Sequence, residues 1–157
     1  MADETILHAI LTMLDNAGVA YRHLEHEPTH TSEQSAAARG EPVRIGGKAL
    51  VVRAAGADHL FVLSAARRLD SAAIRRRFQS KHSRFATAGE LLELTGLVPG
   101  SVPPFGHPIL PLPLYVDESV TANERIAFNA GALTHSVIMR VTDYLALAKP
   151  TIFTFSK

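Results

Sequence analysis

Near the N-terminus, apolar residues recur at the spacing of an amphipathic helix. They are Ile6, Leu7, Ile10, Leu11, Met13 and Leu14. Asp3 is a suitable N-cap for this helix, and Gly18 is a suitable residue to end it. Residues 19–24 then alternate weakly between apolar and polar, which predicts an edge strand. A second helix is predicted from Thr31 or Ser32 through residue 39, before a glycine at residue 40.

The central feature of the pattern is an apolar run that two glycines open. Residues 46–47 are both glycine, Lys48 follows, and residues 50–52 are the strand formers Leu-Val-Val. Because this run is continuous rather than alternating, it predicts a strand that is covered on both faces. A turn at 55–58 and a returning strand over 59–65 complete a predicted hairpin.

Two further helices and a rigid loop are predicted in the middle of the chain. Asp70 or Ser71 opens the first helix, and Thr87 or Ala88 opens the second. Residues 97–108 are rich in proline and glycine yet keep several apolar side chains. A stiff loop of this kind suits either a pocket wall or a structural crossover.

The C-terminal part is predicted to contain strands over 110–116, 124–129, 133–139 and 151–155. The first carries two prolines, so it should begin late and lie at a sheet edge. Gly131 separates the next two strands as a bend or a point of close backbone approach. Thr142 or Asp143 should cap a last helix. Because strands outnumber helices without regular alternation, we expect a single compact mixed α/β domain over 1–157. Its sheet should be strongly curved, with helices packed outside.

Composition narrows the function only slightly. The chain has 157 residues, 46% of them hydrophobic and 20% charged, with a net charge of +1. This balance is ordinary for a globular domain and provides no overall field that attracts nucleic acid. Cysteine is absent, which excludes disulfide and thiolate chemistry. No apolar run reaches the roughly 18 residues of a membrane span. We therefore expect a cytoplasmic protein with no membrane or DNA partner.

Lys48 is the first candidate for chemistry. A lysine that opens an apolar strand is costly to bury without a partner or a substrate. The glycines before it lack Cβ atoms, so a ligand backbone or a phosphate can approach closely. The alternative is that the two glycines form a turn and that Lys48 is a surface residue beside it.

His26 and His30 are four residues apart with acidic residues nearby, a spacing that suits a metal site on a helix. Pro28 lies between them and breaks such a helix. We therefore interpret the segment as a turn, and we expect neither a metal nor another cofactor.

A basic cluster lies in the middle of the chain. It consists of Arg67, Arg68, Arg75, Arg76, Arg77, Lys81, His82 and Arg84. Such a cluster is either a solvated helix face or a contact for phosphates. Few aromatic residues are interleaved with it, so it does not indicate base stacking.

Three motifs together resemble the YbaK/prolyl-tRNA-synthetase-associated domain family. The first is the strand-opening lysine within 47–52, and the second is the Gly-x-x-x-Pro loop at 100–104. The third is the late strand with a central glycine at 128–136, followed by Asp143-Tyr144-Leu145. The resemblance extends from about Tyr21 to Leu147.

The resemblance implies a fold and an activity. The implied fold is a compact α/β domain on a barrel-like mixed sheet. The implied activity is hydrolysis of the ester between a wrong amino acid and the 3′ adenosine of a tRNA, of a prolyl type or carrying a small amino acid. Because the chain lacks synthetase catalytic and anticodon-binding domains, we expect a freestanding deacylase. The expected partners are mischarged tRNA and, in addition, an aminoacyl-tRNA synthetase.

The resemblance also implies roles for particular residues. Lys48 is the implied catalytic residue. With a tRNA as the substrate, the basic cluster provides the predicted tRNA contacts, which are Arg75, Arg76 and Arg77. The predicted substrate-binding residues are Gly47, Ala49, Gly100, Pro104, Phe105, Gly131, Thr134, His135 and Ser136. Family members often have a polar residue after the lysine, whereas this chain has alanine, which leaves the amino-acid specificity open.

Elementary chemistry is consistent with this interpretation. Ester hydrolysis requires a positioned water, stabilisation of an oxyanion and a hold on the leaving sugar. The chain has no Gly-x-Ser-x-Gly elbow and no convincing zinc ligands, so Lys48 is the main electrostatic group. Backbone N–H groups near Gly131 are further candidate donors, and the ribose 2′-hydroxyl is a candidate to orient water.

Two other functions remain open at this point. One is a binding module on the same fold that contacts tRNA or a synthetase without hydrolysis. The other is a hydrolase or binding protein for small acyl compounds. A deacylation assay would decide on the first. Against the second, the basic cluster favours a polyanionic partner, and loss of binding at raised salt would distinguish a polyanion from a small acyl compound.

Overall fold

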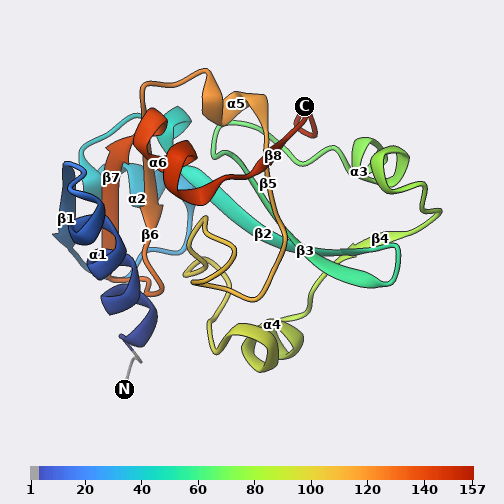
Figure 1. Ribbon diagram of the computed structural model, residues 1–157, viewed down its shortest axis with the longest axis horizontal. Helices are drawn as coiled ribbons and strands as arrows, with labels where there is room; N and C mark the ends of the chain where they lie inside the picture. The colour runs from blue at the N-terminus through green and yellow to red at the C-terminus, as the bar shows by residue number, and fades with distance from the viewer. Residues whose placement is uncertain (1–3) are drawn as a thin grey trace.

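The computed structural model describes residues 4–157 (Figure 1). The helices are α1 (Thr5–Ala17), α2 (Ser32–Arg39), a 3₁₀ helix (Val43–Ile45), α3 (Ser71–Phe78), α4 (Ala88–Thr95), α5 (Glu118–Thr121) and α6 (Val141–Ala148). The strands are β1 (Tyr21–Glu25), β2 (Gly47–Ala54), β3 (Ala57–Ser64), β4 (Ser83–Phe85), β5 (Leu114–Val116), β6 (Arg125–Asn129), β7 (His135–Arg140) and β8 (Thr151–Ile152).

Helix ends follow the predicted caps where side chains can reach the backbone. The side chains of Thr31, Asp70 and Thr87 accept hydrogen bonds from the first turns of α2, α3 and α4. The last helix is different, because α6 begins after Arg140 without a side-chain cap, so the prediction of Thr142 or Asp143 was wrong. The predicted cap Asp3 lies outside the described residues.

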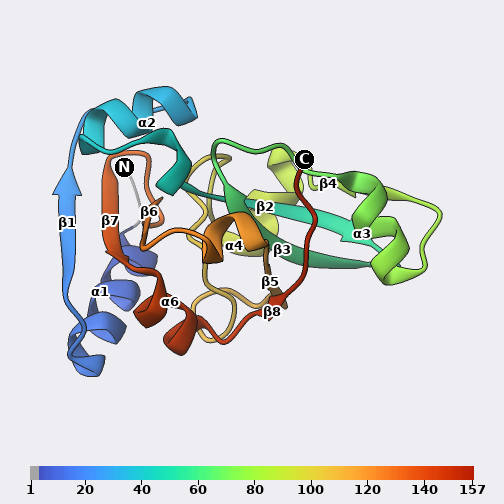
Figure 2. The same cartoon turned by 90° about the horizontal axis from the view of Figure 1, so that it is seen from above.

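The strands form two sheets, and the predicted mixed α/β class with helices packed outside is confirmed. One sheet has the order β4-β2-β3-β5-β8 and the other is antiparallel with the order β1-β7-β6. Figure 2 shows the two sheets side by side, with α2 near the place where they meet. Within residues 4–157 neither sheet closes into a barrel.

The hairpin β2–β3 lies inside the larger sheet, and apolar side chains pack on both of its faces, as predicted. Successive residues of β2 point to opposite faces, so Val51 packs in one apolar cluster and Val52 in another. The same alternation places Val62 of β3 in the first cluster and Phe61 in the second. Lys48 pairs with Leu63 at the open end of this hairpin.

Several strand predictions need correction. The short strand β5 begins only at Leu114, as expected, but it lies between β3 and β8 rather than at an edge. Strand β7 begins at His135 rather than residue 133, because the chain turns at Gly131 with φ of 82°. Strand β8 ends at Ile152, and the strand β4 was not predicted. By contrast, β1 is an edge strand as predicted.

Asp117 attaches the C-terminal segment to the larger sheet. Its carboxylate is fully buried and accepts hydrogen bonds from the backbone N–H groups of Phe155 at 2.6 Å and Ser119 at 2.9 Å. Burial alone would raise the pKa of this carboxyl group, but hydrogen bonds from Ser119, Phe155 and Ser156 outweigh burial, and the net pKa is lowered. The charged carboxylate therefore stabilises the fold.

We expect Asp117→Asn to lower the free energy of unfolding by about 1–3 kcal/mol, because an amide NH₂ would face a buried backbone donor. Urea unfolding at neutral pH measures this change. Asp58→Asn is the control, since Asp58 pairs with the exposed Arg53 and its loss should cost less than about 1 kcal/mol. Equal losses in the two variants would contradict the assignment.

The lowered pKa of Asp117 also determines how the free energy of unfolding changes with pH. The contribution of Asp117 is complete above the ordinary aspartate pKa of about 3.9 and is lost as the pH falls towards the lower folded-state pKa. The gap in stability between the native protein and Asp117→Asn should therefore narrow on acidification in this range.

Candidate active site

The two sheets meet at the double glycine that precedes Lys48. Gly46 forms a parallel bridge with Ala127 of β6, which is the contact that joins the sheets. A Cβ atom on Gly47 would lie 2.6 Å from Cδ1 of the buried Ile126, and a Cβ atom on Gly46 would lie 3.0 Å from Cβ of Ala65. Both glycines are therefore needed for close packing, and they hold the start of β2 against the second sheet.

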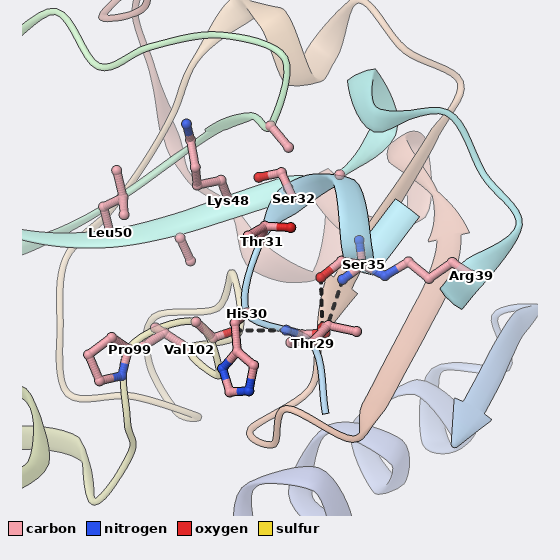
Figure 3. A pocket seen from close by; sticks show the side chains of 16 residues that line it. Thr29, His30, Thr31, Ser32, Ser35, Arg39, Lys48, Leu50, Pro99 and Val102 are labelled. Atoms are coloured by element: carbon pink, nitrogen blue, oxygen red, sulfur yellow. Dashed lines mark hydrogen bonds between the residues drawn. The ribbon is translucent and has the colours of Figure 1, made fainter. Parts of the chain in front are cut away.

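A pocket of about 300 Å³ opens at this junction (Figure 3). Its walls come mainly from the start of β2, the loop at 99–102, and α2 with the residues before it, and Ala65 after β3 and Asn129 of β6 complete them. The lining residues are Thr29, His30, Thr31, Ser32, Ser35, Arg39, Gly46, Gly47, Lys48, Ala49, Leu50, Ala65, Pro99, Gly100, Val102 and Asn129. The lining thus combines hydroxyl groups from the α2 region with two cationic side chains.

Lys48 lies at the mouth of the pocket and extends towards the segment after β3 (Figure 3). Its Nζ donates a hydrogen bond to the backbone carbonyl of Arg67 at 2.8 Å. Partial burial lowers the pKa of Lys48, the positive charge of Arg68 lowers it further, and Glu33 acts in the opposite direction. Within residues 4–157 no carboxylate forms an ion pair with Lys48, so its charge is free to meet a ligand.

Arg39 is the second cation of the pocket, and sequence reasoning did not identify it. Its side chain is 8% exposed. Nε donates to Ser136 Oγ at 3.0 Å, and Nη2 donates to Asn129 Oδ1 at 3.1 Å. Burial lowers the pKa of Arg39 to about 10, so the guanidinium remains charged at neutral pH. Among residues 4–157 no carboxylate pairs with this buried charge.

Asn129 and Ser136 connect Arg39 to the rest of the pocket wall. Asn129 Nδ2 donates to the carbonyl of Gly100 at 2.8 Å, so one amide joins the arginine to the glycine-proline loop. Ser136 Oγ also lies 2.8 Å from Nε2 of His26. The guanidinium is therefore held in one orientation by residues from both strands of the β6–β7 hairpin.

The structure brings four of the predicted substrate-site residues to the pocket. Gly47, Lys48, Ala49 and Gly100 all line it. Ser136 lies behind the wall, where it contacts Arg39.

The other predicted residues lie away from the pocket lining. The carbonyl of Pro104 accepts a hydrogen bond from the Tyr144 hydroxyl at 2.6 Å, and Phe105 packs in the core against Phe128 and Tyr144. The carbonyl of Thr134 accepts from the His26 N–H.

Gly131 and His135 lie near α1 instead. A Cβ atom on Gly131 would lie 2.8 Å from Cγ2 of Ile6. The N–H of Gly131 itself bonds to the carbonyl of Ser101, so this donor does not face a ligand. His135 Nδ1 lies 2.9 Å from Nε2 of His23, and its ring stacks on that of His23.

The arginines of α3 are distant from the pocket along β2. Arg75 donates to Ser83, which pairs with Ala54 at the far end of that strand, about 20 Å from Lys48 at the rise of an extended strand. Arg77 lies over the ring of Phe153 at 4.9 Å. In contrast, Arg67 and Arg68 adjoin Lys48 at the mouth.

The two histidines of the predicted turn are separated, as the intervening proline suggested. His30 lines the pocket, whereas His26 bonds to the carbonyl of Glu27 and to Ser136. The part of the chain from residue 4 onward contains no cluster of three or more histidine, cysteine or acidic residues placed to hold a metal. In the same part, no helix combines the length and apolar character needed to cross a bilayer.

Comparison with known proteins identifies the class to which this small α/β domain belongs. The model of the aminoacyl-tRNA editing domain matches residues 26–147. The multifunctional Ser/Thr-tRNA deacylase ProXp-y of Escherichia coli K12 is 33% identical over 166 residues, covering 100% of this chain and 97% of that protein. The chain belongs to the aminoacyl-tRNA editing domain family, which confirms the resemblance described above.

Solved structures agree with this placement. A proposed trans-editing enzyme for prolyl-tRNA synthetase superposes with a TM-score of 0.82 at 27% identity, covering 99% of both chains. The hypothetical protein APE2540 superposes with a TM-score of 0.83 at 24% identity, covering 94% of this chain and 99% of that one. The second likeness supports the fold alone.

The close packing at the double glycine should make the stability of the protein sensitive to substitution of Gly47. We expect Gly47→Ala to destabilise the protein by about 1–3 kcal/mol, because its new methyl group would overlap buried Ile126. Gly89→Ala is the matched control, since its Cβ would meet only Thr87 Oγ1 at 4.0 Å within α4, and it should be neutral or slightly stabilising. Thermal unfolding of both variants measures the difference, and an unchanged Gly47→Ala would show that the sheets do not require this contact.

Proposed function

We propose that this domain hydrolyses the ester bond of mischarged tRNA in trans, with Lys48 as its principal electrostatic group. The observation that carries this proposal is the position of Lys48, which forms no ion pair with a carboxylate of residues 4–157 and stands at the mouth of a polar pocket. Membership in the editing-domain family supports the reaction class, and likeness to a Ser/Thr-tRNA deacylase supports action on aminoacyl-tRNA.

The reaction places simple demands on the pocket. Water attacks the ester carbonyl, the bond to the ribose oxygen breaks, and the products are a free amino acid and a tRNA with a free hydroxyl. In this proposal Lys48 stabilises the negative charge that develops on the carbonyl oxygen or neutralises the adjacent phosphate. The ribose 2′-hydroxyl and the hydroxyl groups near α2 are the groups proposed to orient the attacking water.

The proposed substrate is a tRNA of the prolyl type or one carrying a small amino acid. The solved relative described as a trans-editing enzyme for prolyl-tRNA synthetase supports the first, and the pocket volume of about 300 Å³ supports the second. A synthetase that delivers this tRNA is the proposed partner. We further infer that residues 1–157 act as a single editing domain in the cytoplasm.

Two sets of arginines are proposed to contact the tRNA backbone. Arg67 and Arg68 adjoin the mouth, where the terminal phosphates of the acceptor strand must lie if the ester reaches Lys48. Arg75, Arg76 and Arg77 lie near the far end of β2, where only a more distant part of the tRNA can reach them.

We expect Lys48→Ala to reduce kcat/KM for deacylation by on the order of 10²-fold or more, as loss of a main transition-state charge typically does. The measurement is release of radiolabelled amino acid from mischarged tRNA. Lys149→Ala is the control, because it removes an exposed lysine outside both the pocket lining and the basic cluster. Near-normal turnover by a folded Lys48→Ala protein would contradict the mechanism. Binding of tRNA without any turnover by the native protein would favour a non-catalytic module.

The arginines should differ in how they affect binding. Each phosphate contact acts on every tRNA alike and contributes to the salt dependence. We therefore expect Arg67→Ala/Arg68→Ala and Arg76→Ala/Arg77→Ala each to weaken all substrates in parallel and to flatten the dependence of kcat/KM on salt. A pair that keeps the native salt slope lies on a solvated face and does not contact the tRNA.

A further inference from the structure

We propose that Arg39 is the specificity-determining residue of the pocket and that it donates hydrogen bonds to an oxygen on the side chain of the bound aminoacyl group. This inference rests on the proposed function for the identity of the ligand. It assigns to Arg39 a preference for hydroxyl-bearing side chains over purely apolar side chains of the same size.

Arg39 has hydrogen-bond donors that the described residues leave unused. A guanidinium carries five N–H donors, and the hydrogen bonds to Ser136 and Asn129 use two of them. Within residues 4–157, Nη1 has no hydrogen-bond acceptor. Arg39 is buried, with only 8% of its surface exposed, and it lines the pocket. A buried charge with free donors on a pocket requires an acceptor from a ligand or from water.

These donors are also held in place by the neighbouring residues. Ser136 fixes Nε and Asn129 fixes Nη2, while Asn129 is itself bound to the carbonyl of Gly100. Nη1 lies near Gly46, where a Cβ atom would approach it at 3.6 Å. The guanidinium therefore keeps its orientation without a ligand, which lowers the entropic cost of forming further hydrogen bonds.

The direction in which the substrate enters brings its side chain towards Arg39. Lys48 is at the mouth beside the Arg67–Arg68 segment, so the phosphate and ribose belong there. Arg39 is more deeply buried than Lys48, and the amino-acid side chain is the part of the substrate that extends beyond the ester. The side chain thus reaches Arg39, while the ester remains near Lys48.

The chemistry of the lining selects the class of side chain. Arg39 donates but does not accept, so it binds a hydroxyl oxygen and repels an ammonium group. The nearby hydroxyl groups of Thr29 and Ser35 are 2.8 Å apart and bond to each other. A serine or threonine side chain supplies the missing acceptor, whereas an alanine side chain leaves the buried donors without one.

A purely structural role for Arg39 would explain only part of the geometry. Its bonds to Ser136 and Asn129 do attach α2 to the β6–β7 hairpin. That role does not require donors facing the pocket. It also predicts that removal of Arg39 affects every substrate equally.

The test compares one tRNA charged with serine and with alanine. We expect the native protein to prefer the serine ester by at least about tenfold in kcat/KM. Arg39→Met should bring this ratio close to one, mainly through loss of activity on the serine ester. Arg39→Lys, which keeps one charge and some donors, should give an intermediate ratio. Arg22→Met is the control, because Arg22 is exposed and pairs with Glu41 outside the pocket. It should leave the ratio unchanged.

A binding measurement keeps the proposal falsifiable where Arg39→Met fails to fold. Calorimetry with the native protein compares non-hydrolysable adenosine amides that carry serine, alanine or 2,3-diaminopropionate. The serine amide should bind at least about tenfold more tightly than the alanine amide, and the diaminopropionate amide should bind most weakly. Equal binding of the three, or parallel loss of both activities in Arg39→Met, would overturn the role of Arg39. A serine preference in binding without any hydrolysis would overturn the proposed function and leave the role of Arg39 intact.

Discussion

The contact on which the site depends is the close approach of two sheets at Gly46 and Gly47. The bridge to Ala127 joins the sheets, and Ala65 and Ile126 crowd the places where side chains at these two positions would lie. Because Lys48 follows directly, its backbone position is fixed by packing in the core. The pocket therefore owes its geometry to the core rather than to a flexible loop, which is the arrangement that precise catalysis requires.

The pocket is assembled from segments that are far apart in the chain. Helix α2 provides Arg39, the β6–β7 hairpin provides Asn129 and Ser136, and the loop after α4 provides Gly100. Each of these residues restrains another, so the polar wall behaves as one unit. Lys48 stands on the other side of the pocket with a single hydrogen bond to a carbonyl. A rigid interior thus faces a more mobile cation at the mouth, because a single bond restrains a long side chain only weakly.

Local features of the fold were predictable from the sequence, and long-range ones were not. Thr31, Asp70 and Thr87 cap helices through contacts within three residues, so their signals are complete in a short stretch. The place of β5 inside the sheet depends on parallel pairing with β3 and β8. Two prolines in the preceding segment led to the prediction of an edge strand instead. Lys48 was found because a charge within an apolar strand is unusual. Arg39 was missed because it follows a run of small residues at a helix end, and its partners are 90 and 97 residues away.

The hydrogen bonds behind the pocket also determine where protons can travel. The carbonyl of Glu27 only accepts, so Nδ1 of His26 carries a hydrogen, and this imidazole meets the wall through Ser136. Between it and the pocket lie the guanidinium of Arg39 and the amide of Asn129, and neither group is a ready acid or base at neutral pH. This part of the wall is therefore polar but provides no path for proton transfer to His26. In the proposed reaction, the proton released by the attacking water leaves towards the solvent or the substrate rather than through the wall.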